Sequence, residues 1–197
     1  MQVMIIADVE ASGLDPRKHS ILSIGAVEFE HPERQFYEEC RMWDGASIMT
    51  DSLAVNGFTE EECRDTKKKS LEEVMNSFYH WIEQCDEKTL AGQNPSFDRD
   101  FINDSFSRSH IGWHFAYRTL DLQSMAYMDM IKKGIKPPRK NDRTDLSTDT
   151  IFKYVGLPTE PKPHHGLTGA QMEAEAFSRI LHGKNLLPEF KGYPLNK

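Results

Sequence analysis

A short apolar stretch that ends in two acids constrains the fold of this chain more than any other feature. Residues 3–8, VMIIAD, form an apolar run, and residues 21–30, ILSIGAVEFE, form a second run rich in β-branched residues after a GLDP turn. Short apolar runs bounded by turn residues are typical of buried strands. The two runs therefore predict a pair of neighbouring core strands, with acids at the end of the first strand.

The segments that follow alternate between expected strands and helices. We expect a third strand around residues 34–42, a helix over residues 70–85 capped by Ser70, and a short buried strand at residues 88–93. Further helices are expected from residue 98, over residues 146–158 and over residues 164–177. This order of elements predicts an α/β fold in which helices flank a mixed sheet.

Length, hydropathy and cysteine content bound the class of protein. A chain of 197 residues can bury one substantial core, so we expect a single domain over residues 1–197, with a mobile basic loop at about 132–147 and a loop-like tail at 184–197. The sequence has no apolar run of about 20 residues and no basic leader, which predicts a cytoplasmic protein without a membrane partner. Three cysteines without CxxC spacing predict buried free thiols.

Asp8 and Glu10 lie two positions apart at the end of the first predicted strand. Alternation along a strand places residues i and i+2 on the same face. Two carboxylates beside a core repel each other and lose hydration, which is costly unless a cation lies between them. Oxygen ligands of this kind suit Mg²⁺ or Mn²⁺. A solvated edge strand would explain the same pair without a metal.

Asp98 occupies the start of a predicted helix in the stretch LAGQNPSFDRDFI. An acid in the first turn complements the helix dipole, and this role alone would account for Asp98. The apolar neighbours Phe97 and Phe101 are four positions apart, which is the spacing of one helix face. Asp98 therefore indicates a functional site only in combination with the other motifs.

The ordered succession of motifs resembles a known family. IIADVEASGLDP with ILSIGAVEFE, then LAVNGFTEEE, then AGQNPSFDRDFI and then a helix containing HH are similar to the DEDDh group of 3'-to-5' exonucleases, over residues 4–182. This group includes relatives of the proofreading exonuclease subunit of bacterial DNA polymerase and of RNase T, and it has a ribonuclease-H-like fold. The resemblance implies that Asp8, Glu10 and Asp98 bind two ions, Mg²⁺ or Mn²⁺, and that His164 is the general base, with the adjacent His165 left open as the alternative base.

The resemblance also implies a pocket for the terminal nucleotide of a single-stranded DNA or RNA 3' end. The residues expected to line this pocket flank the first two motifs, and they are Ala11, Ser12, Leu14, Asn94 and Phe97. Some relatives form dimers, so a homodimer is a further expectation that nothing in the sequence itself supports. Whether DNA or RNA is the substrate depends on how the pocket treats one 2'-hydroxyl, and the sequence leaves both open.

The third motif departs from the family pattern, because the aspartate expected five positions after the histidine is missing. Counting five from His164 gives Gly169, and counting five from His165 gives Ala170. Glu173 lies about 40° around the helix axis and about 6 Å along it from Gly169. Helical side chains lean toward the N-terminus, so we expect Glu173 to reach the place of the missing acid. The alternatives are an ordinary exposed glutamate and a loss of catalysis.

The segment from Lys132 to Arg143 holds six basic residues and is the predicted contact for a nucleic-acid backbone. Phe58, Trp113 and Phe115 are candidates to stack on bases, although core packing explains each of them equally well. The leading interpretation is a metal-dependent 3'-to-5' exonuclease. A catalytically silent nucleic-acid-binding module and a hydrolase of very short oligonucleotides, to which a net charge of −7 is better suited, are the alternatives.

Overall fold

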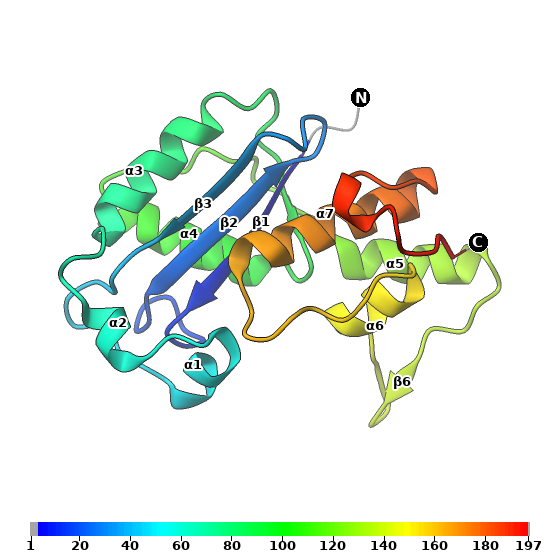
Figure 1. Ribbon diagram of the computed structural model, residues 1–197, viewed down its shortest axis with the longest axis horizontal. Helices are drawn as coiled ribbons and strands as arrows, with labels where there is room; N and C mark the ends of the chain where they lie inside the picture. Colours follow the sequence, from blue (N-terminus) through cyan, green and yellow to red (C-terminus); the bar gives the residue numbers. More distant parts are fainter. Residues whose placement is uncertain (1–3, 197) are drawn as a thin grey trace.

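A five-stranded mixed sheet lies at the centre of the computed structural model, which describes residues 4–196 (Figure 1). The strand order is β3-β2-β1-β4-β5, in which β1 is antiparallel to β2 and parallel to β4. The strands are β1 (Ile5–Ala11), β2 (Ile21–Glu28), β3 (Gln35–Glu39), β4 (Leu90–Gly92) and β5 (Leu120–Asp121). The sheet confirms the predicted fold class, and β1 to β4 lie where the sequence placed them.

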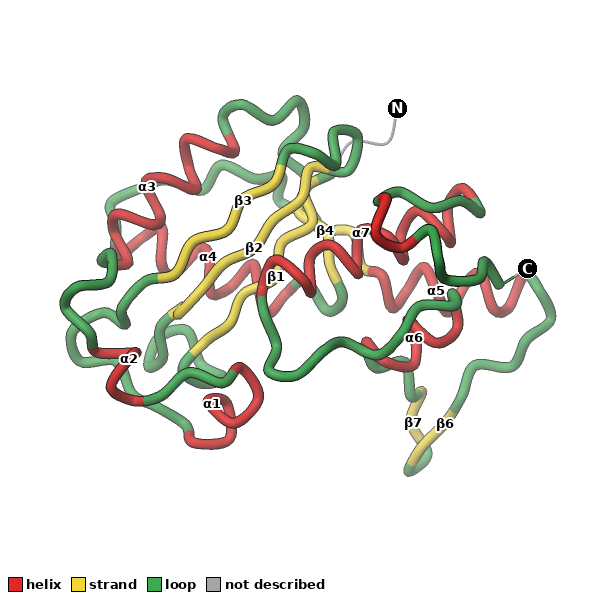
Figure 2. Tube along the Cα trace, in the orientation of Figure 1, coloured by secondary structure: helices red, strands yellow, loops and turns green. Residues whose placement is uncertain are grey.

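Helices cover both faces of this sheet (Figure 2). Helices α3 and α4 pack on one face, while α7 crosses β1 and β2 on the other face with α5 and α6 beside it. The helices are α1 (Thr50–Asn56), α2 (Glu60–Arg64), α3 (Leu71–Ile82), α4 (Ser96–Arg108), α5 (Leu122–Lys132), α6 (Thr148–Tyr154), α7 (Gly166–His182) and the short 3-10 helix η1 (Pro188–Phe190). Within residues 4–196, no helix combines the length and the apolar character needed to cross a bilayer.

Several local predictions can be compared directly with this structure. Ser70 caps α3 through a capping box with Glu73, as its position before the helix predicted. The three cysteines are buried free thiols. The predicted basic loop contains a small hairpin of β6 (Arg139–Lys140) and β7 (Arg143–Thr144), which projects from the body of the molecule (Figure 1). Phe115 is buried in the core with the Trp113 ring at 5.2 Å, so packing is the structural role of this pair.

Alternation along β1 decides which side chains reach each layer. Ala7 and Val9 belong to the core formed with α3 and α4, whereas Met4 and Ile6 belong to the core formed with α5, α6 and α7. Residues 8 and 10 continue the even-numbered row. The two acids of the first motif therefore lie on the face that α7 covers, at the end where the apolar row stops.

The first turn of α7 lies directly against β2, because glycine stands at the point of contact. Asp8 of β1 is paired in register with Gly25 of β2. A Cβ atom added to Gly25 would lie 2.1 Å from the backbone nitrogen of Leu167 and 2.2 Å from the carbonyl carbon of Gly166. Only a glycine at this position allows the helix backbone to approach so closely. The contact fixes the height of α7 above the acids of β1.

The first prediction tests this contact. Gly25→Ala should destabilise the protein by about 3 kcal/mol or more, the upper end of the usual cost of overpacking, because the obstructing atoms are backbone. Gly192→Ala is the matched control, since a Cβ there would meet no other heavy atom within 4 Å. Chemical denaturation of both variants measures the effect. Equal denaturation midpoints for Gly25→Ala and the wild type would contradict the contact.

Candidate active site

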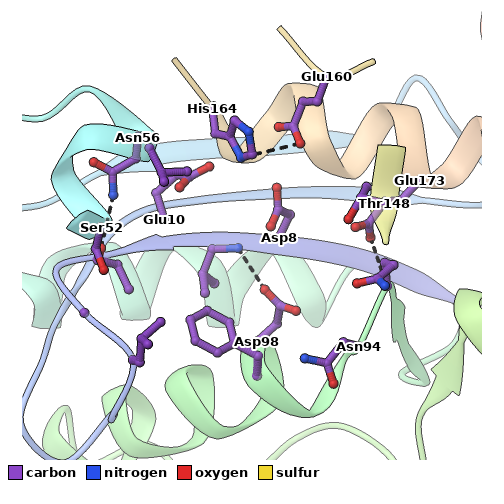
Figure 3. A pocket seen from close by; sticks show the side chains of 17 residues that line it. Asp8, Glu10, Ser52, Asn56, Asn94, Asp98, Thr148, Glu160, His164 and Glu173 are labelled. Carbon is purple, nitrogen blue, oxygen red and sulfur yellow. Dashed lines mark hydrogen bonds and ion pairs between the residues drawn. The ribbon is translucent and has the colours of Figure 1, made fainter. Parts of the chain in front are cut away.

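A cavity of about 300 Å³ opens beside the C-terminal half of β1 (Figure 3). It is bounded by β1, α1, the start of α4, the start of α6 and the first turns of α7. Five acids from four different parts of the chain line it, and they are Asp8, Glu10, Asp98, Glu160 and Glu173. The structure therefore brings together the four predicted metal ligands and adds one acid that the sequence reasoning missed.

Asp98 is held beside β1 by a hydrogen bond to the strand. Strand β4 pairs with β1 only as far as Ala91, and it ends at Gly92 before the chain turns into α4. The backbone N–H of Val9, beyond the end of this ladder, donates to Asp98 Oδ1 at 3.0 Å. The first-turn acid of α4 is thus tied to the strand that carries Asp8. Its role extends beyond complementing the helix dipole.

Glu173 reaches the cavity from the second turn of α7. The residue is only 7% exposed, which excludes an ordinary solvated helix position. Its Oε2 accepts a hydrogen bond from the backbone N–H of Gln93 at 3.1 Å, just beyond the end of β4. A Cβ on Gly92 would lie 3.2 Å from the same oxygen, so the small residue leaves room for the carboxylate. The predicted convergence of Glu173 with the other acids is present.

Position 169 has no room for a side chain in this arrangement. A Cβ on Gly169 would lie 1.9 Å from Asp8 Oδ2 and 3.3 Å from Glu160 Oε1. The carboxylate of Asp8 therefore occupies the space that a side chain at position 169 would enter. After the Asp8 carboxylate, the nearest side-chain oxygen to this position belongs to Glu160.

Glu160 lies on the loop between α6 and α7, and its side chain is 8% exposed. Its Oε2 is 3.6 Å from Nδ1 of His164. One ligand atom from each of Glu10, Glu160 and His164 lies within 4.8 Å of the other two. The only sequence signal for this residue was its place four positions before the motif histidine in a proline-rich loop, where no periodicity indicates direction.

The two neighbouring histidines have different surroundings. His164 lines the cavity, and its backbone N–H donates to the carbonyl of Val55 at 3.0 Å, which ties this loop to α1. The ring of His165 instead stacks on Tyr37, with ring centroids 4.2 Å apart. Of the two histidines left open by the sequence, His164 is the one that faces the acids.

Four of the five residues expected to bind substrate line the cavity, and these are Ala11, Leu14, Asn94 and Phe97. Leu14 is 67% exposed at the rim. Ser12 lies elsewhere: it is fully buried, its hydroxyl donates to the carbonyl of Ser47, and the same oxygen accepts from the backbone of Ser20. Ser12 therefore supports the loop around Ser47 and does not face the cavity. The pairing of β1 with β2 shifts its register between Glu10 and Ala11, so the alternation that places Asp8 and Glu10 on one face does not extend to Ser12.

Burial and mutual repulsion raise the pKa values of the acids in the cavity. Desolvation, followed by repulsion from Glu160 and Asp98, raises the pKa of Glu10 to about 7. Desolvation also raises the pKa of Asp98 to about 7, and the pKa values of Asp8 and Glu173 lie well above their usual ranges for the same main reason. Oxygen donors crowded in this way fit Mg²⁺ or Mn²⁺, whose charge would remove the repulsion.

Comparison with known proteins places this geometry in a family. The chain matches the 3'-5' exoribonuclease Rv2179c-like domain over residues 1–181. It is 30% identical over 185 residues to the 3'-5' DNA exonuclease Cap18 of Escherichia coli, with 91% of each chain covered. It is 25% identical over 178 residues to the PolC-type DNA polymerase III of Thermotoga maritima, where 90% of this chain covers 12% of the polymerase.

Solved structures show the same fold at low sequence identity. E. coli Exonuclease I in complex with a dA16 oligonucleotide superposes with a TM-score of 0.71 at 15% identity, covering 93% of this chain and 42% of that one. Cell-death related nuclease 4 gives a TM-score of 0.73 at 14% identity, covering 93% of this chain and 64% of the nuclease. This chain thus corresponds to part of several longer proteins.

The family match, together with the fold and the acid-lined cavity, identifies an exonuclease-family domain with a ribonuclease-H-like fold. The chain belongs to the Rv2179c-like family of 3'-5' exoribonuclease domains. This membership confirms the predicted exonuclease family, the predicted fold and, at the level of the domain family, the predicted enzyme class.

The second prediction concerns the stability of the metal-free protein. Glu10 and Asp98 have ordinary pKa values of 4.5 and 3.8, both raised to about 7 in the fold. The native state therefore binds more protons than the unfolded state across this window, and stability falls as pH rises. In chelator, the melting temperature should be higher at about pH 5 than at about pH 8.

Carboxyls with lowered pKa values do not oppose this trend, because their contribution is already complete above their unfolded pKa. Glu10→Gln should reduce the pH dependence, and excess Mg²⁺ should raise the melting temperature mainly at the higher pH. A metal-free protein whose melting temperature increases from about pH 5 to about pH 8 would contradict the repulsion described here.

Proposed function

We propose that this protein is a two-metal-dependent exonuclease that removes nucleotides from single-stranded 3' ends. The observation that carries the proposal is the convergence of buried carboxylates with His164 in one cavity. Like charges buried together are costly unless a cation lies among them. The family match and the relatives named as 3'-5' exonucleases support the reaction. The Exonuclease I structure with a bound dA16 oligonucleotide supports a single-stranded substrate.

The residues that would hold two ions, Mg²⁺ or Mn²⁺, are Asp8, Glu10, Asp98 and Glu173, with Glu173 in place of the missing aspartate. When bound, the ions would offset the charge of the phosphate and make the attacking water more acidic. His164 takes a proton from this water on an imidazole nitrogen, since histidines in general titrate near neutral pH. The water oxygen bonds to phosphorus and the bond to the 3'-oxygen breaks. The departing 3'-oxygen takes a proton from solvent water and His164 returns its proton to solvent, so the products are a nucleoside 5'-monophosphate and a new 3'-hydroxyl.

The cavity volume of about 300 Å³ is at the lower end of the range for small-molecule sites, which suits one terminal nucleotide. Its apolar walls are Ala11, Leu14 and Phe97, and Asn94 adds a polar group. The comparisons name both a DNA exonuclease and an exoribonuclease, so we propose nucleic acid as the substrate class and test both strands.

The third prediction tests the reaction and the relocated acid together. With Mg²⁺ or Mn²⁺, the purified protein should shorten 5'-labelled single-stranded DNA or RNA from the 3' end, and chelator should abolish the ladder. Glu173→Gln should lower the rate about 100-fold or more, because loss of even an outer-shell partner of a metal site costs about 10- to 100-fold. Glu189→Gln, the same change at an exposed residue, should leave the rate unchanged.

Three outcomes would count against the proposal in different ways. Intact strands under every condition, from a protein that remains folded, would favour the catalytically silent binding module. Full activity of Glu173→Gln would show that Glu173 is not a metal ligand, while the proposal of an exonuclease would stand. Rates that fall as the strand lengthens would identify a hydrolase of short oligonucleotides.

We also propose that the basic segment at residues 132–143, which runs from the end of α5 into the hairpin of β6 and β7, guides the nucleic-acid strand toward the cavity. All six of its Lys and Arg residues are exposed. The chain leaves the hairpin at residue 144 and begins α6 with Thr148, which lines the cavity. Contacts from such side chains to phosphates position a strand without reading its bases.

The fourth prediction measures this contact by its salt dependence. Lys136→Gln combined with Lys140→Gln should raise KM for long strands with little change in kcat. The slope of log binding against log salt should fall by about 1.4, at about 0.7 per lost phosphate contact on a single strand. Lys184→Gln with Lys191→Gln, an equal charge change at exposed positions of the tail, is the control. Equal salt slopes for the two double variants would exclude the hairpin as a strand contact.

A further inference from the structure

Glu160 carries a buried carboxylate oxygen that no residue between 4 and 196 satisfies. Its side chain is 8% exposed, and Oε1 has no hydrogen-bond partner in this part of the chain. Its other oxygen, Oε2, lies 3.6 Å from Nδ1 of His164, which is too long for a hydrogen bond. A buried carboxylate oxygen without a donor is costly, because nothing replaces its lost hydration. Oε1 therefore needs a partner that the protein atoms do not supply.

Glu160 lines the cavity, and its unsatisfied oxygen lies beside Gly169 and Asp8. Glu160 Oε1 lies 3.3 Å from the place of a Cβ at position 169, and Asp8 Oδ2 lies 1.9 Å from the same place. On the other side, Glu160 offers a ligand atom within 4.8 Å of those of Glu10 and His164. These atoms have the chemistry of a divalent cation site, with carboxylate oxygens from two glutamates.

The loop that carries Glu160 is anchored by hydrogen bonds that do not involve the carboxylates lining the cavity. The backbone N–H of Glu160 donates to Asp149 Oδ1 at 3.3 Å, which links the loop to the first turn of α6. The backbone of His164 is bonded to α1 through Val55. These two bonds hold the loop in place, and Figure 3 shows the Glu160 side chain directed toward His164 at the cavity.

We propose that Glu160 is a further ligand of the metal site and supplies a carboxylate that position 169 lacks. The inference rests on the proposed function, since it assigns a role within the same cavity. Glu173 approaches the site at the end of β4, where it is bonded to Gln93. Glu160 approaches beside Glu10. Two glutamates from separate segments then share the role of one aspartate, and glycine at position 169 leaves space for the carboxylates of Asp8 and Glu160.

The fifth prediction is a Mn²⁺ titration by calorimetry on the whole chain, in the presence of adenosine 5'-monophosphate, a product of the proposed reaction. Glu160→Gln should bind at least one ion about 10- to 100-fold more weakly than the wild type, the range for disturbing a metal site. Glu160→Asp, which keeps the charge on a shorter side chain, should lie between them. The isosteric control Glu189→Gln should bind as the wild type does.

A melting curve in chelator separates loss of a ligand from loss of the fold. Glu160→Gln should melt at the wild-type temperature or above, because the change removes one charge from a crowded set of acids. A lower melting temperature for Glu160→Gln than for Glu160→Asp would contradict the description of this carboxylate as unsatisfied.

The outcomes of the titration distinguish this inference from the proposed function. A wild-type protein that binds no Mn²⁺ would overturn both. If Glu173→Gln weakens binding while Glu160→Gln binds as the wild type does, the two-metal exonuclease stands and the role of Glu160 falls. Unchanged Mn²⁺ affinity together with a shifted pH–rate profile would make Glu160 a positioning residue for His164, which also contradicts the proposal.

Discussion

The close contact between α7 and the sheet is the constraint on which the rest of the site depends. A Cβ on Gly166 would lie 2.9 Å from the carbonyl oxygen of Asp8 and 3.0 Å from the backbone nitrogen of Gly25. Because no side chain separates helix from sheet, the Asp8 carboxylate occupies the space beside Gly169. The absence of the family's aspartate is thus consistent with the packing, and any replacement acid has to come from another position in the chain.

Burial and charge act against each other at this point of the fold. The even-numbered face of β1 continues the core beyond Ile6, but its next two side chains are Asp8 and Glu10. A core that placed apolar residues there would be more stable, and functional sites commonly break such local rules at a cost in stability. A divalent cation would reverse the balance, since each carboxylate that repels its neighbours would then attract the ion. The same geometry therefore links the fold, metal binding and the proposed chemistry.

How far the sequence predicts the site depends on whether a residue lies in a regular element. Strand alternation placed Asp8 and Glu10 on one face, and helix geometry directed Glu173 toward the cavity. Glu160 lies in a loop, where no period relates sequence to direction, and only the folded chain brings it to the acids. Ser12 was misassigned because proximity to a motif does not show where a side chain points. The short helices α1 and α2 and the helix α5 were missed, since α5 buries only residues spaced four apart and the other two depend on tertiary contacts.

The most direct test of the central claim, that the cavity is a working metal site with its fourth acid relocated, is anomalous diffraction from crystals grown with Mn²⁺. The account predicts two anomalous peaks in the cavity about 3.5 to 4 Å apart, the separation that two-metal hydrolysis uses, with Asp8 in contact and a carboxylate from Glu160 or Glu173 as a ligand. A cavity without Mn²⁺, in crystals whose fold is intact, would show that these acids do not form a metal site and would contradict the account.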